Sequence, residues 1–141
     1  MIFDVEHYDC LIIEDDPATL HLLITYFEKN GLTCKSVICG IRGLEALERG
    51  LPKVILLDLT LPNLHWYEVV LEIRAKNSSK NIPLFLFGET KCADMNAKIK
   101  NMGVTGVIPK PFCLKDFDIL RKYASKPLID NITLWNFEDN E

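Results

Sequence analysis

Apolar residues follow two alternating patterns along the chain. In one they form short uninterrupted runs, and in the other they recur every three or four positions. An uninterrupted run is typical of a strand buried on both faces of a sheet, whereas the wider spacing is typical of a helix with one apolar face. The runs predict five strands, at residues 10–13, 33–37, 54–57, 82–87 and 104–108. A stretch with helical spacing follows each of them.

The helix expected after the first strand has the clearest limits. Its apolar positions have the spacing i, i+3, i+4 and i+7: Leu20, Leu23, Ile24 and Phe27. Asp16 and Pro17 suit its first turn, because Asp caps free N–H groups and Pro needs no N–H partner there. Gly31 suits its end. Similar patterns predict helices within residues 40–50, 66–73, 95–102 and 114–124.

Strands that alternate with helices pair in parallel through right-handed crossovers. The pattern therefore predicts an α/β fold with a doubly wound parallel sheet. A chain of 141 residues suits one such domain, which we expect to occupy residues 1–124. Residues 125–141 do not continue the alternation, and we expect them to form a mobile acidic tail. A docking segment, or the remnant of a linker to a further domain, is the alternative.

Composition and charge argue against two classes of binding partner, nucleic acids and membranes. The net charge is −4 and no cluster of basic residues occurs, which argues against direct nucleic-acid binding. No apolar stretch approaches the roughly 20 residues that cross a bilayer, and the acidic N-terminus does not resemble a signal peptide. We therefore expect a cytoplasmic protein without a membrane partner. Its five cysteines are odd in number and scattered, which favours reduced thiols over disulfides or metal ligands: Cys10, Cys34, Cys39, Cys92 and Cys113.

Charged residues stand where three of the predicted strands end. Glu14, Asp15 and Asp16 follow the first strand. Asp58 follows the third and Lys110 the fifth, and functional groups of open parallel sheets gather at this edge. Neighbouring carboxylates repel one another, so they favour a hard cation such as Mg²⁺, with Lys110 as a further positive charge. Asp16 is expected only to cap the helix, and helix capping is also the alternative for Glu14 and Asp15.

Four stretches occur in an order that is specific when they are taken together: "LIIEDDP", "VILLDLTLPNLHWYEVV", "IPLFLF" and "GVIPKPF". In this order they resemble the receiver domain of two-component response regulators, over about residues 8–124. The resemblance implies a flavodoxin-like (βα)5 fold with strand order 2-1-3-4-5. It also implies that Asp58 is the phosphoacceptor, which attacks a phosphohistidine or a small phosphodonor in nucleophilic carboxylate chemistry.

The resemblance assigns further roles around the phosphoacceptor. Glu14 and Asp15 match the acidic pair that, with Asp58, holds Mg²⁺. Thr60 matches the position whose backbone carbonyl completes the metal shell. Lys110 matches the lysine that binds the phosphoryl oxygens, and in this family the peptide bond between that lysine and the following proline is cis.

The sequence departs from the family at both positions of its usual switch. Where the family has Thr or Ser after the fourth strand, this chain has Gly88, followed by Glu89. That hydroxyl normally holds the phosphoryl group, and Thr90 could replace it only if the loop were shifted. Val107 stands where the family has Tyr or Phe. Trp66 replaces a usual glycine, which we attribute to packing. We therefore expect phosphorylation on Asp58 with a non-standard output.

The expected protein is a signalling module rather than an enzyme, and its partner is a histidine kinase or a phosphotransfer protein that docks beside the first helix. The alternative is a pseudo-receiver, which works without phosphorylation as an adaptor or as a dimerisation module through helix 4, strand 5 and helix 5. A dehalogenase-type phosphatase would need a second aspartate where Thr60 stands. No glycine-rich GxGxxG motif follows any strand, which argues against dinucleotide binding.

Overall fold

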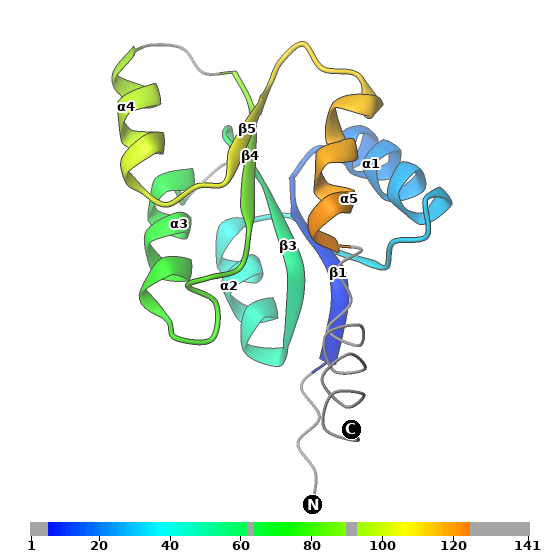
Figure 1. The fold of residues 1–141 in the computed structure, drawn as a ribbon, viewed down its shortest axis with the longest axis horizontal. Helices are drawn as coiled ribbons and strands as arrows, with labels where there is room; N and C mark the ends of the chain where they lie inside the picture. Colours follow the sequence, from blue (N-terminus) through cyan, green and yellow to red (C-terminus); the bar gives the residue numbers. More distant parts are fainter. Residues whose placement is uncertain (1–5, 62–63, 90–92, 125–141) are drawn as a thin grey trace, which may run out of the picture.

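The structure, a computed structural model, describes residues 6–61, 64–89 and 93–124 of the chain. Strands and helices alternate through these residues (Figure 1). The strands are β1 (Glu6–Ile13), β2 (Cys34–Val37), β3 (Gly50–Asp58), β4 (Leu84–Gly88) and β5 (Gly106–Pro109). The helices are α1 (Pro17–Lys29), α2 (Gly40–Arg49), α3 (Trp66–Ala75), α4 (Ala93–Asn101), the 3-10 helix η1 (Leu114–Asp118) and α5 (Ile119–Ala124). The expectations for Thr90 and residues 125–141 concern positions outside the described residues.

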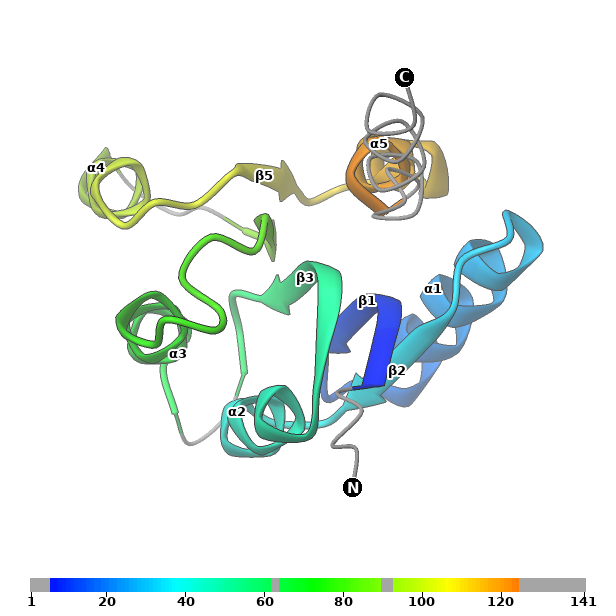
Figure 2. The same cartoon turned by 60° about the horizontal axis from the view of Figure 1, so that its bottom comes forward.

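All five strands are parallel and form one sheet in the order β2-β1-β3-β4-β5. This confirms the doubly wound α/β fold and its implied strand order. Helices α1 and α5 cover one face of the sheet, and α2, α3 and α4 cover the other (Figure 2). Among the described residues, no helix has the length and apolar character needed to cross a membrane.

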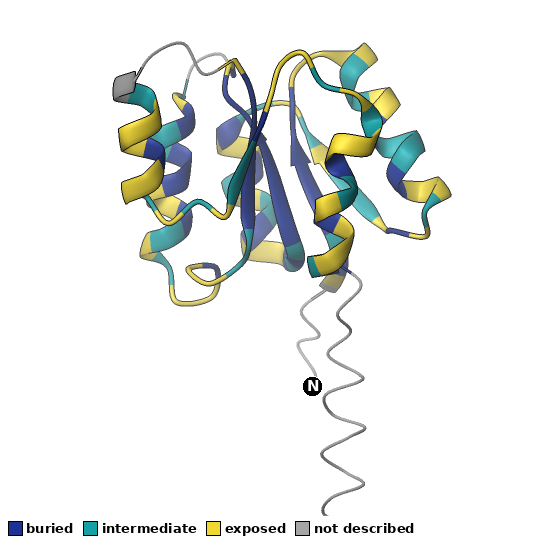
Figure 3. Cartoon of the chain, turned by 45° about the horizontal axis from the view of Figure 1, so that its top comes forward, coloured by how far each residue is buried: buried dark blue, intermediate teal, exposed yellow. Residues whose placement is uncertain are grey.

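The core lies on both faces of the sheet. Successive residues of β1 alternate between the faces: Leu11 and Ile13 pack towards α2 and α3, whereas Cys10 and Ile12 pack towards α1 and α5. The central strands are mostly buried, as the colouring in Figure 3 shows: residues 10–13 of β1, residues 54–58 of β3 and the whole of β4 are buried. Burial on both faces explains why these strands have uninterrupted apolar sequences.

Several element boundaries differ from the sequence prediction: β1 begins four residues earlier than predicted, at Glu6, and β4 and β5 begin two residues later, at Leu84 and Gly106. Strand β3 begins at Gly50, four residues before the apolar run, because residues 50–52 pair with the start of β1. The final helix is divided into η1 and α5 rather than continuous. Helix α1 begins as predicted, because the Asp16 carboxylate accepts a hydrogen bond from the Thr19 backbone N–H at 3.0 Å.

An aromatic cluster joins the end of β4 to the segment after β5 and to α1. The Phe87 ring centroid lies 6.0 Å from that of Phe112 and 5.8 Å from that of Phe117. Phe117 also contacts Phe27 of α1, with 6.2 Å between centroids. The tilted edge-to-face arrangements are those that aromatic pairs prefer. They hold the chain beyond β5 against the sheet near its carboxyl edge.

Candidate functional site

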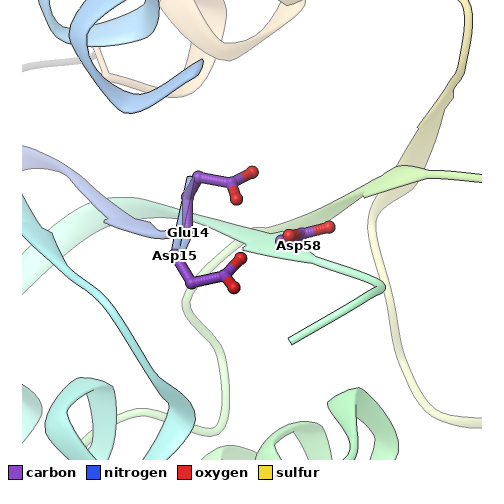
Figure 4. A group of neighbouring side chains, drawn as sticks. All are labelled: Glu14, Asp15 and Asp58. Carbon is purple, nitrogen blue, oxygen red and sulfur yellow. The ribbon is translucent and has the colours of Figure 1, made fainter. Parts of the chain in front are cut away.

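Three carboxylates meet where β1 and β3 end. These strands are neighbours, with Ile13 opposite Leu57, so the residues that follow them emerge side by side. The side chains of Glu14 and Asp15 extend from the end of β1 towards Asp58 (Figure 4). One ligand oxygen from each of the three residues lies within 4.8 Å of the others. The structure thus brings together the three acidic residues that the sequence singled out.

Burial makes this cluster electrostatically costly. The exposed fractions of Glu14 and Asp58 are only 3% and 2%, whereas Asp15 is exposed. Burial raises the pKa of Glu14 from 4.5 to about 8, and proximity to Asp58 contributes to the increase. A hydrogen bond from the Asp16 backbone N–H to Glu14 Oε1, at 2.9 Å, acts in the opposite direction. Without a cation, Glu14 therefore retains a proton at neutral pH.

The turn after β3 orients the Asp58 carboxylate. The Thr60 backbone N–H donates to Asp58 Oδ1 at 3.0 Å. The Thr60 hydroxyl Oγ1 lies 3.0 Å from Oδ1 and 3.2 Å from Oδ2. The sequence reasoning considered only the backbone carbonyl of Thr60 and missed its side chain. The sequence held a signal only for the backbone contact, because an Asp side chain commonly accepts a hydrogen bond from the N–H two residues later.

Lys110 approaches the same edge from β5. Its backbone N–H donates to the Gly88 carbonyl at 3.1 Å, and the Lys110–Pro111 peptide bond is cis, as the resemblance implied. Lys110 and Pro111, with Glu89 and Phe112, line an open pocket of about 430 Å³. Hydrogen bonds from Thr19 are the main cause of the lowered pKa of Asp16, and the charge of Lys110 is a lesser cause. Lys110 thus contributes positive potential at the start of α1.

The two atypical switch positions have structural explanations. Gly88 has a φ of 134°, a conformation that residues with side chains rarely adopt. A Cβ placed there would lie 3.2 Å from Leu59 Cβ and 3.6 Å from Asp58 Oδ1. Val107 is partly buried and packs with the core on the α3 and α4 side, as expected for a strand residue. Trp66 is buried, which agrees with its expected packing role.

A family model described as a response regulator receiver domain matches residues 10–122. The chain belongs to this family. Over 107 residues the receiver is 28% identical to the sensor histidine kinase CheAY of Helicobacter pylori, covering 74% of this chain and 13% of that kinase. Over 131 residues it is 29% identical to the Regulator of RpoS of Escherichia coli, covering 93% of this chain and 38% of that protein. It spans less than half the length of either relative.

Solved structures show the same fold. The signal receiver domain of a histidine kinase from Syntrophus aciditrophicus has a TM-score of 0.77 at 20% identity, covering 84% of this receiver and 90% of that chain. A receiver domain of a sensor histidine kinase from Pseudomonas aeruginosa has a TM-score of 0.75 at 23% identity, covering 86% of this receiver and 100% of that chain. The Pseudomonas domain was crystallised with a magnesium ion coordinated in its active-site cleft.

Proposed function

We propose that this receiver accepts a phosphoryl group on Asp58, in a Mg²⁺-dependent reaction of a two-component or phosphorelay system. The observation that carries the proposal is the convergence of Glu14, Asp15 and Asp58 within 4.8 Å at the carboxyl edge of the sheet. Membership of the receiver family supports it, because receiver domains are generally phosphoacceptors and signal transducers rather than enzymes. The donor would be a histidine kinase or a phosphotransfer protein.

The donor set fits a magnesium ion. Magnesium prefers oxygen ligands and commonly takes one or two carboxylates, with waters and phosphate oxygens in its other positions. Glu14, Asp15 and Asp58 would hold it through carboxylates, and Thr60 through its backbone carbonyl. Burial, with a smaller contribution from Asp58, raises the pKa of Glu14, and a bound cation would favour its charged form. When bound, the ion would supply positive charge to the carboxylates and to the phosphoryl oxygens of the donor.

Asp58, Lys110 and Glu89 have different roles in the proposed phosphoryl transfer. Asp58 provides the nucleophilic oxygen, and its burial restricts the access of water to that oxygen. Lys110 is exposed and provides an ammonium group to the pocket it shares with Glu89. A cation there stabilises the negative charge of a transferring phosphoryl group. Glu89 has the opposite sign and is exposed, so it weakens that effect.

The output of the receiver is proposed to be non-standard. Gly88 supplies no hydroxyl, and Val107 supplies no ring that could change position. A second candidate function follows from the same two residues: a pseudo-receiver that works as an adaptor or homodimer through α4, β5 and α5, without phosphorylation. The cavity of about 510 Å³ beside β5, which Val107 and Ile119 line, gives this face a recess for a partner.

Intact-protein mass measured after incubation with acetyl phosphate and Mg²⁺ tests the first function. We expect the wild-type chain to gain one phosphoryl group and Asp58→Asn to gain none. Glu72→Gln, which removes an exposed carboxylate of α3 outside the acidic cluster, is the matched control and should be labelled like the wild type. Labelling of Asp58→Asn would contradict the assignment of the phosphoacceptor. An unlabelled wild type would instead favour the adaptor.

A further inference from the structure

Among the residues that the structure describes, a hydroxyl from the turn after β3 contacts the proposed phosphoacceptor. Thr60 Oγ1 lies within hydrogen-bond distance of both oxygens of Asp58, at 3.0 Å from Oδ1 and 3.2 Å from Oδ2. The Thr60 backbone N–H also donates to Oδ1, at 3.0 Å. Oδ1 is therefore the oxygen held by both donor groups of one residue.

Oδ1 is also the oxygen that faces Gly88. The Cβ that another residue would place at position 88 would lie 3.6 Å from Oδ1. The Thr or Ser hydroxyl that the family usually has at position 88 would therefore lie next to Oδ1, the oxygen that Thr60 already contacts. The φ of 134° at Gly88, together with the nearby Leu59 Cβ, leaves no unstrained place for a side chain there. Position 88 therefore supplies no hydroxyl beside Oδ1, whereas Thr60 does.

We propose that the Thr60 hydroxyl replaces the hydroxyl that position 88 lacks. It orients Oδ1 for attack and then donates to the phosphoryl group once that group is attached. This inference rests on the proposed function, since it concerns the reaction of Asp58. It assigns to the Thr60 side chain a role separate from that of its backbone carbonyl, which the family resemblance places in the metal shell.

The chemistry of the transfer requires the hydroxyl to change partner. A lone pair of Oδ1 forms the new O–P bond, while the P–O bond of acetyl phosphate breaks and acetate leaves with the electron pair. No proton is transferred in this step. Oδ1 then becomes an ester oxygen and a weaker acceptor, whereas the attached phosphoryl oxygens carry negative charge and are stronger acceptors. The Thr60 hydroxyl can rotate to donate to one of them.

Thr60 offers a clean separation of its two donors. The backbone N–H bond to Oδ1 forms a local turn that any residue other than Pro at position 60 can make. Thr60→Val keeps this N–H and the shape of the side chain but removes the hydroxyl. Thr60→Ser keeps the hydroxyl and removes a methyl group. Because Thr60 is exposed, neither change leaves a buried cavity.

The test compares the rate of phosphorylation of the full chain by acetyl phosphate and Mg²⁺, followed by intact mass over time. The net contribution of a typical hydrogen bond corresponds to roughly a 5- to 10-fold change in an equilibrium or rate. We expect Thr60→Val to be slower than wild type by this factor and Thr60→Ser to stay close to wild type. Calorimetric titration with Mg²⁺ alone should give similar affinities for all three, since the backbone carbonyl is unchanged.

Each other outcome overturns the inference. Equal or faster labelling of Thr60→Val, with wild type labelled, would remove the hydroxyl from the reaction and leave the proposed function standing. An unlabelled wild type would overturn both. Equal loss in Thr60→Val and Thr60→Ser would show that side-chain packing, not the hydroxyl, matters. If thermal unfolding shows that Thr60→Val does not fold, Thr60→Ala replaces it, and wild-type labelling by Thr60→Ala would equally overturn the inference.

Discussion

Replacing Asp58 by Asn should increase the free energy of unfolding of the receiver when no divalent cation is present. The substitution removes one negative charge from a cluster of three carboxylates and leaves the size of the side chain nearly unchanged. The Asn carbonyl oxygen can still accept the hydrogen bonds from the Thr60 N–H and hydroxyl. Its amide nitrogen, buried in place of Oδ2, can donate to the neighbouring carboxylates. Relief of repulsion is therefore the main effect.

The separations in the cluster set the size of this effect. Two unit charges 4.8 Å apart repel by about 3 kcal/mol at an effective dielectric constant near 20. At neutral pH the pKa of Glu14, about 8, keeps that residue mostly protonated, so the repulsion acts chiefly between Asp58 and Asp15. Asp15 is exposed, and solvent screens its charge. We expect Asp58→Asn to stabilise the metal-free protein by about 1–2 kcal/mol.

Urea unfolding at pH 7 in EDTA, monitored by circular dichroism, measures this difference. Adding Mg²⁺ should stabilise the wild type, because ligands that bind only the folded state shift the unfolding equilibrium, and should stabilise Asp58→Asn much less. Glu72→Gln should leave both measurements unchanged. The reasoning is refuted if Asp58→Asn destabilises the protein by more than about 1 kcal/mol in EDTA, since a net hydrogen-bond contribution of that size would then outweigh the repulsion.

The pKa of Glu14 and the backbone of Gly88 give two further predictions. Because Glu14 holds its proton in the folded state up to pH about 8 but releases it near its ordinary value of 4.5 when unfolded, its contribution should make stability in EDTA fall as pH rises between these values. Urea midpoints across this range should show the fall in wild type and a weaker one in Glu14→Gln; equal slopes would contradict the assignment. Gly88→Ala should lower the free energy of unfolding by about 1–3 kcal/mol, through backbone strain and contact with Leu59. Gly31→Ala, at φ 82° with open space around the new Cβ, adds backbone strain without a new contact and should cost less in the same urea titration; an equal or larger cost would contradict the prediction.

The sequence sufficed for those parts of the site that depend only on where strands end. Glu14 and Asp58 directly follow apolar runs, and neighbouring parallel strands necessarily bring such residues to one edge. The order of the strands came from the family resemblance, because apolar runs do not specify which strands are neighbours. Lys110 was placed at the same edge because it follows the fifth apolar run and because the resemblance assigns a lysine to that position.

Features that depend on individual backbone and side-chain angles could not be read from the sequence. It showed that Gly88 lacks a hydroxyl but not that its φ excludes one. It could not show that the Thr60 hydroxyl would turn back onto Asp58. The division of the last helix was also hidden, because Leu114, Phe117 and Leu120 are spaced by three residues, which fits a 3-10 helix as well as the apolar face of an α-helix.

The backbone at Gly88 also bears on how this receiver can evolve. A single codon change to serine would restore a hydroxyl to the sequence, but it would place a side chain on a φ of 134° and against Leu59. A benefit to signalling would require a second change that resets the local backbone, and the first change alone lowers stability. The two changes are therefore epistatic. Selection on this chain is expected to proceed through residues that already contact the phosphoacceptor rather than by gain of the usual family switch.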